Sequence, residues 1–299
     1  MLHVIINSNA GPGHPPGIVQ ELEQLIAQSG VTAQVHCASG GEQFEALLRK
    51  AVAQFPPVVI VGGGDGTVSS AARITLGTPT ALGILPMGTL NHFARDLLLP
   101  TVLSEAVRVA ISGRATRVDT GEVNGVAFLN NSSIGLYPDV VRDRQRQQRR
   151  LGRSKRAAML WAVLAVLRRT PLLRMRLELD GKAQEFRGPF VFVGNNNYLM
   201  EGFRIGSRER LDQGRLSVYT TRRSSAGALL GLAMRALFHR LHQAHDFAAT
   251  FAQQLTVELK HRRVLVAVDG EVRSMETPLV FRINPRSLVV LTPLEVSAT

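Results

Sequence analysis

The feature that most constrains the fold is a glycine-rich loop that directly follows an apolar run. The run covers residues 58–61, and the loop has the sequence Gly62-Gly63-Gly64-Asp65-Gly66-Thr67. A helical pattern follows the loop. A strand without polar residues is typical of a parallel sheet that is covered by helices on both faces. Open sheets of this kind bind ligands at the carboxyl ends of their strands, which is where this loop lies. The loop therefore predicts an α/β domain with a binding site at this edge.

The composition of the loop indicates which chemistry it serves. Glycines let the backbone approach a ligand closely, and the N–H groups at a helix start favour phosphate. Asp65 in the middle of the loop makes sense if a cation lies between the carboxylate and the phosphates. The alternative is an ordinary glycine turn with no ligand.

A second loop of the same kind follows the next predicted strand, residues 81–85. Gly88 and Thr89 lie at its junction with a helical pattern over 89–98. The hydroxyl and the amides at this junction could meet the same phosphates. Thr89 could equally serve as the N-cap of the helix, which is a common role for threonine.

A third candidate lies near the C-terminus, where the predicted strand 264–268 ends in Asp269-Gly270-Glu271. Asp-Gly favours a type I′ hairpin turn, and this reading needs no function. The functional reading is a general base, because a carboxylate can accept the proton of a substrate hydroxyl.

The pattern of predicted secondary structure changes at about residue 115. Residues 1–115 alternate apolar runs at 4–6, 31–37, 58–61 and 81–85 with helical patterns, which predicts an open α/β sheet. Residues 116–299 hold short β-rich runs, including 125–134, 186–194, 279–283 and 287–292. We expect a mainly antiparallel, β-sandwich-like second domain, with helical segments at about 154–169 and 224–246. Its last strand could return to the first domain.

The charge balance points to an anionic partner. The chain of 299 residues carries 35 basic and 23 acidic side chains, a net charge of +12. Segment 142–156 has eight basic residues and one acidic residue, a net +7, and an apolar run at 157–167 follows it. Such a combination is typical of a peripheral contact with an anionic membrane, although a helix with a solvated basic face has the same pattern. Nucleic acid is a poor fit, because only 5% of the residues are aromatic and no recognition motif accompanies the charge.

Other features limit the location and the metal chemistry. Cys37 is the only cysteine, which excludes an internal disulfide and favours a reducing cytosol. We expect a cytoplasmic protein, because the start has no signal-peptide pattern and the longest apolar run is shorter than the ~20 residues of a membrane span. His239, His242 and His245 recur at helical spacing, but surface histidines explain them better than a metal site does.

Taken together, these motifs resemble the diacylglycerol kinase catalytic family. The resemblance rests on GGGDGT at 62–67, PMGTLNHFARD at 86–96, DGE at 269–271 and SLVVLTP at 287–293. The segments 7–11 and 130–137 also resemble motifs of this family, which includes bacterial lipid kinases and the sphingosine and ceramide kinases. The GGDGT motif alone is shared with NAD kinases, and the continuation of the second loop separates the two groups.

The resemblance implies an ATP-dependent kinase that acts on a lipid hydroxyl. Glu271 would be the proton acceptor with Asp269 beside it, and Asp65 would act through the magnesium of the nucleotide. The implied ATP-binding residues are Asn7, Ser39, Gly62, Gly63, Gly64, Asp65, Gly66, Thr67, Gly88 and Thr89. The implied partners are a lipid substrate and the inner face of a membrane.

Two departures from the family pattern stand out. Val68 is followed by Ser69 and Ser70, where the family usually has Asn and Glu. Gln213 stands where bacterial members often carry a magnesium-binding Asp, and an amide replaces a carboxylate poorly on a hard dication. Asp212 could compensate as a metal ligand, although it is displaced by one residue.

These departures leave alternatives to a lipid kinase. One is an NAD kinase or another small-molecule kinase of the same superfamily. Another is a non-catalytic regulator that binds lipid. Neither the lipid nor the oligomeric state follows from the sequence.

Overall fold

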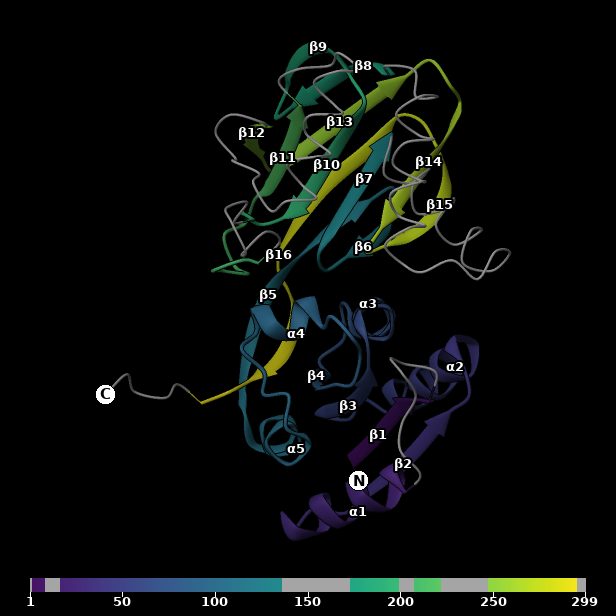
Figure 1. The fold of residues 1–299 in the computed structure, drawn as a ribbon, viewed down its shortest axis with the longest axis vertical. Coiled ribbons are helices and arrows are strands. Elements are labelled where there is room, and N and C mark those ends of the chain that lie inside the picture. The colour runs from purple at the N-terminus through teal and green to yellow at the C-terminus, as the bar shows by residue number, and fades with distance from the viewer. Residues whose placement is uncertain (1, 9–16, 136–172, 199–206, 222–246, 295–299) are drawn as a thin grey trace, which may run out of the picture. The chain divides into compact units, whose positions relative to one another are not determined.

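The computed structural model describes residues 2–8, 17–135, 173–198, 207–221 and 247–294 (Figure 1). The chain divides into two compact units. Unit 1 comprises residues 1–120 and 285–299, and unit 2 comprises residues 121–284. The expected boundary at 115/116 falls inside strand β5 (Arg114–Val123). The return of the last strand brings the chain back into unit 1.

Unit 1 is built on a parallel sheet. Its strands lie in the order β2 (Ala33–Ala38), β1 (Leu2–Asn7), β3 (Val58–Gly63), β4 (Ala81–Pro86), and then the final part of β16 (Leu279–Thr292). All of these neighbours are parallel, and β16 joins β4 through Val290 and Leu82. The apolar run before the glycine loop is the buried strand β3, as predicted.

Helices of unit 1 pack against this sheet. On one face lie α1 (Ile18–Gln28) and α5 (Leu103–Ser112), and α1 buries Ile18, Leu22 and Ile26 at four-residue spacing. The remaining helices are α2 (Gly41–Val52), α3 (Asp65–Thr75) and the short α4 (His92–Asp96). Helix α3 contacts β3, β4 and α2, and most of its residues are buried.

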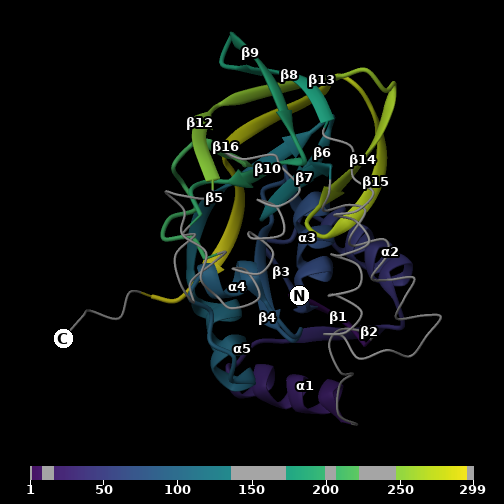
Figure 2. The same ribbon diagram turned by 45° about the horizontal axis from the view of Figure 1, so that its top comes forward.

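Unit 2 is an antiparallel β-sandwich (Figures 1 and 2). One sheet runs in the order β12 (Phe247–Ala252), β11 (Leu216–Thr221), β10 (Phe190–Asn195), β7 (Asn131–Gly135), β14 (Arg263–Val268) and β15 (Glu271–Glu276). The other contains the first part of β16 with β13 (Gln254–Leu259), β8 (Leu173–Leu179) and β9 (Lys182–Gly188), while the short β6 (Val126–Phe128) pairs with β5. Side chains of both sheets, such as Val193, Val266, Leu177 and Phe281, form one buried core. The predicted fold class is confirmed.

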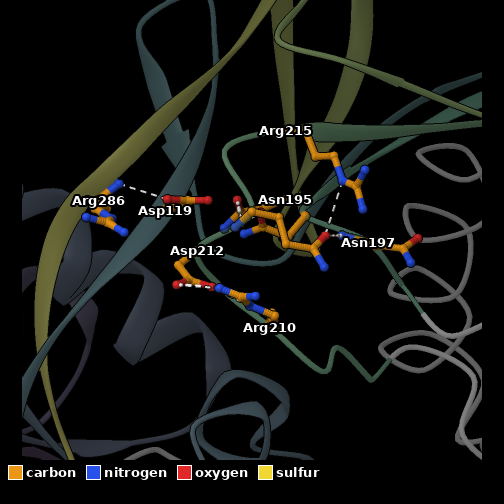
Figure 3. A network of polar contacts seen from close by, with 9 residues as sticks. Asp119, Asn195, Asn197, Arg210, Asp212, Arg215 and Arg286 are labelled. Atoms are coloured by element: carbon orange, nitrogen blue, oxygen red, sulfur yellow. Dashed lines mark hydrogen bonds and ion pairs between the residues drawn. The ribbon is translucent and has the colours of Figure 1, made fainter.

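The C-terminal strand differs from the prediction. Residues 279–283 and 287–292 were predicted as separate runs. Instead β16 runs through both segments. Arg286 takes a left-handed backbone conformation with φ 50°, and its N–H donates to Asp119 Oδ1 at 2.8 Å (Figure 3). This contact lets the strand pass the proline without ending.

The bounds of other helices and strands also differ from the prediction. Helix α4 covers only part of the helical pattern at 89–98, and β6 and β7 divide the run at 125–134. Strand β9 was predicted only in its last part and β12 was not predicted, since their sequences lack a clear alternation of apolar and polar residues. The helical segments at 154–169 and 224–246, with His239, His242 and His245, lie outside the described residues.

Candidate active site

The predicted nucleotide-binding residues lie at one edge of the sheet of unit 1. Asn7 ends β1, Ser39 directly follows β2, and the glycine loop begins with the last two residues of β3 and continues into α3. Gly88 comes shortly after β4. Because the four strands are adjacent and parallel, the structure brings these residues to their common carboxyl edge.

The glycine-rich loop leads directly into α3. Gly64 is the N-cap and Asp65 is the first helical residue, and no side chain caps the helix. The first N–H groups of a helix have no acceptor inside it, so those of residues 65–67 point out of its N-terminus. Asn7 Nδ2 donates to Thr67 Oγ1 at 3.1 Å, which ties the end of β1 to this first turn.

The two glycine loops touch each other through their backbones. A Cβ atom on Gly88 would lie 2.3 Å from the Cα of Gly64, which no real contact allows. The Met87 N–H also donates to the Gly63 carbonyl at 3.0 Å. Glycine at 64 and 88 therefore follows from the close approach of the loops.

Asn91 holds the second loop in place and was not predicted as a site residue. Its Oδ1 accepts the Gly88 N–H at 2.9 Å, and its Nδ2 donates to the Gly88 carbonyl at 2.9 Å. Asn91 is also the N-cap of α4, with φ 50°, so the N-cap alternative for Thr89 is wrong. Thr89 is exposed at this edge of the sheet.

Gly66 differs from the other glycines of the first loop. A Cβ atom on Gly62 would meet Ile6 and Met87, and one on Gly63 would meet Thr67. Among the residues that the structure describes, no such neighbour outside the helix lies within 4 Å of a Cβ atom at Gly66. Packing against these residues therefore does not explain a glycine at this helical position, whereas the close approach of a ligand would.

Ser39 lies just before helix α2, whose N-cap is Gly40, and is bonded to the first turn of that helix. Its N–H and its Oγ both donate to Gln43 Oε1, at 2.7 and 2.8 Å. The side chain is exposed at the end of β2, on the same edge as the glycine loops.

The serines that depart from the family pattern are part of the packing of α3. Ser69 is buried, and Ser70 Oγ donates to Glu45 Oε1 on α2. Small side chains at these positions allow the two helices to pack closely.

Unit 2 carries the second group of predicted residues. Asp269 and Gly270 have φ of 47° and 83°, and Val268 pairs with Glu271, so the predicted type I′ hairpin turn is present. Glu271 is exposed, and its Oε2 accepts a hydrogen bond from Arg273 Nη2 at 2.9 Å. Glu271 and Asp65 belong to different units, so their convergence on one substrate stays a prediction.

The described residues around Gln213 are engaged in contacts with one another. Asp212 accepts hydrogen bonds from Arg210 Nε and Nη2 at 3.0 and 3.1 Å, and this pairing raises the pKa of Arg210 (Figure 3). Gln213 Oε1 accepts from the Asn197 N–H and from Arg215 Nε, both at 3.3 Å (Figure 3).

The Asp212 carboxylate is thus paired with Arg210, and the Gln213 amide oxygen beside it is bonded to Arg215 and Asn197. Among the described residues, no group of three or more His, Cys, Asp or Glu could hold a metal ion. The proposed metal role of Asp212 therefore finds no ligand set in the described part of the chain.

In the part of the chain that the structure describes, no helix is both long and apolar enough to cross a bilayer.

Comparisons with known proteins cover nearly the whole chain. Residues 1–123 match the diacylglycerol kinase catalytic domain, and residues 133–292 match the YegS C-terminal NAD kinase beta sandwich-like domain. Relatives named probable lipid kinase YegS-like, from Yersinia pestis (strain Pestoides F) and Yersinia pseudotuberculosis serotype O:1b (strain IP 31758), are 30% identical over 141 residues. These alignments span 46% of this chain and 47% of each relative, about half of their length.

Solved structures support the same assignment at the level of the fold. A candidate diacylglycerol kinase from Bacillus anthracis str. Sterne superimposes with a TM-score of 0.75 at 22% identity, covering 97% of both chains. A second diacylglycerol kinase from the same strain gives a TM-score of 0.69 at 19% identity, covering 97% of this chain and 96% of that one. With both domains matched in order along the sequence, this chain belongs to the bacterial diacylglycerol kinase family with a YegS-type C-terminal domain.

Proposed function

We propose that this protein is an ATP-dependent kinase that phosphorylates a hydroxyl of a diacylglycerol-like lipid. The observation that carries the proposal is the open space over Gly66, in the first turn of α3. It lies at the carboxyl edge of four adjacent parallel strands, beside the first N–H groups of α3, which have no acceptor inside the helix. A glycine at a helix N-terminus that packing among the described residues does not require fits a bound phosphate.

The residues of unit 1 fit a nucleotide with its magnesium ion. The N–H groups of the first turn of α3 would donate to phosphate oxygens, and Asp65 would face the cation. Asn7 orients the Thr67 hydroxyl, and Asn91 fixes the Gly88 turn against Gly64. When bound, Mg-ATP supplies the phosphoryl group and neutralises its charge.

Glu271 would act as the proton acceptor. Its carboxylate takes the proton of the substrate hydroxyl while that oxygen forms a bond to the γ-phosphorus and the bond to the leaving ADP oxygen breaks. Arg273 holds one carboxylate oxygen, which orients the group. The catalytic effect of the protein is then mainly positioning and charge stabilisation.

The assignment to a lipid substrate rests on the lipid kinase names of the relatives. We further propose that the protein docks on the inner face of an anionic membrane through segment 142–173, which lies outside the described residues except for its last residue. Its net +7 stretch and the apolar run behind it support this, since arginines near anionic headgroups contribute about 1 kcal/mol each.

Transfer of radiolabelled γ-phosphate from ATP to a panel of acceptors in mixed micelles tests the proposal. The panel holds diacylglycerol, monoacylglycerol, ceramide, a sphingoid base, phosphatidylglycerol and NAD. We expect label on a lipid, and Asp65→Ala and Glu271→Gln should each lower kcat by about two to four orders of magnitude. Near-normal kinetics in either variant would exclude the role given to that residue.

The same assay separates the alternatives. Label on NAD alone would identify a small-molecule kinase. Lipid binding with no transfer to any acceptor would identify a non-catalytic regulator.

A further inference from the structure

In unit 2, Asp269 accepts hydrogen bonds from the backbone where strand β7 begins. Asp269 Oδ2 accepts the N–H of Leu129 at 2.9 Å, and Oδ1 accepts those of Asn130 and Asn131 at 2.8 and 3.2 Å. The Asp269 N–H in turn donates to the Asn131 carbonyl at 2.9 Å. Hydrogen bonds from backbone amides to a charged acceptor are among the stronger ones in proteins.

A buried arginine also holds residues 129 and 130. Arg208 is only 4% exposed; its Nη1 donates to the Leu129 carbonyl at 2.7 Å, and its Nη2 donates to Asn130 Oδ1 at 2.8 Å. Asn195 Nδ2 also donates to the Leu129 carbonyl, at 2.8 Å. A buried guanidinium is costly unless its donors are satisfied, so its geometry is closely defined by these acceptors.

This arrangement, which we call the 129–131 clamp, fixes the turn that presents Glu271. Asp269 is a central residue of that turn, and Glu271 is the first residue of β15. In the described part of the sheet β15 is an edge strand that pairs with β14. Anchoring Asp269 to residues 129–131 therefore limits how far the hairpin, and Glu271 with it, can move.

We infer that Arg208 and Asp269 are positioning residues for Glu271, and that Asp269 is not a proton acceptor itself. The inference rests on the proposed function. The Asp269 carboxylate is committed to backbone amides through both of its oxygens, so its contribution to the reaction passes through the geometry of the turn. A displacement of about 1 Å at a reacting group can cost on the order of a hundredfold in rate.

The chain offers a matched control at a second Asp-Gly turn. Asp180 and Gly181, between β8 and β9, have φ of 46° and 83°. Asp180 Oδ1 accepts the N–H groups of Gln253 and Gln254, both at 2.9 Å, and Oδ2 accepts that of Gln253 at 3.2 Å. This turn has the same chemistry as the 129–131 clamp, but no predicted site residue stands on it.

The experiment compares Asp269→Asn with Asp180→Asn by kinase kinetics and thermal melting. We expect both substitutions to lower stability, and Asp269→Asn alone to lower kcat, by about ten- to a hundredfold, with KM for ATP within twofold of wild type. Arg208→Lys keeps the buried positive charge but loses the planar guanidinium group with its paired donors, so it should lower kcat as Asp269→Asn does. This variant replaces Asp269→Asn in the comparison if Asp269→Asn does not fold.

Three outcomes would overturn the inference. The first is equal kcat effects in the two aspartate variants, and the second is no effect in Asp269→Asn and Arg208→Lys. The third is a loss in Asp269→Asn as large as in Glu271→Gln, which would indicate proton transfer by Asp269. If Glu271→Gln retained full activity, the proposed proton acceptor would fail instead, and the aspartate comparison would still report on Asp269.

Discussion

At the scale of single residues, a substitution at Gly66 should affect nucleotide binding without lowering stability. Alanine at this position of α3 meets no described residue outside its own helix within 4 Å, and it favours a helix over glycine by up to about 1 kcal/mol. We therefore expect Gly66→Ala to melt at or slightly above the wild-type temperature. Its KM for ATP should rise at least about tenfold, because the new methyl group fills the space where a phosphate would lie. Thermal melting and ATP titration of activity measure both effects.

Gly88→Ala is the contrasting variant at the same edge of the sheet. Its Cβ would overlap with the backbone of Gly64, so this variant should melt at a lower temperature as well as lose activity. An unchanged KM for ATP in Gly66→Ala would show that the space over Gly66 is not the nucleotide site.

At the scale of elements, the strand pair β10–β11 carries a buried phenol that couples stability to pH. The Tyr219 side chain is fully buried, and its hydroxyl accepts the Tyr198 N–H at 3.3 Å. Burial raises the pKa of Tyr219 above its ordinary value of 10.0. The unfolded chain then releases this proton first as the pH rises past 10, and the folded state loses stability by at most about 1.4 kcal/mol per pH unit. Urea unfolding should therefore show a steeper loss from pH 9 to 11 in wild type than in Tyr219→Phe, and parallel curves would contradict this.

At the scale of the whole molecule, the net charge of +12 predicts binding to anionic membranes that weakens with salt. Replacing Arg146, Arg149, Arg150 and Arg153 by Gln removes four charges from the proposed docking segment. We expect weaker binding to phosphatidylglycerol vesicles and a flatter salt dependence, while activity on a short-chain soluble lipid is retained. Vesicle co-sedimentation over a salt series measures the binding. Unchanged binding by the folded variant would mean that this segment is not the membrane contact.

The three scales differ in how far the sequence predicts them. Around residues 62–67 the local pattern was sufficient, because a buried parallel strand must be uniformly apolar and its exit must bend sharply into a helix. The hairpin at Asp269-Gly270 was predictable for the same local reason. Asn91 was missed, since its two hydrogen bonds to Gly88 depend on the shape of the loop and leave no pattern in the sequence.

What the sequence determined by itself was whatever depends on neighbouring residues: the strands and helices of unit 1, the turn types and the position of the glycine loop. What only the tertiary structure decided were contacts between residues far apart in the chain. Gly64 and Gly88 are both glycine because their backbones touch, and Arg286 continues β16 past Pro285 because Asp119 accepts its N–H. The positioning roles inferred for Asp269 and Arg208 likewise depend on their hydrogen bonds to residues 129–131. Such bonds depend on distance in space and not on separation along the chain.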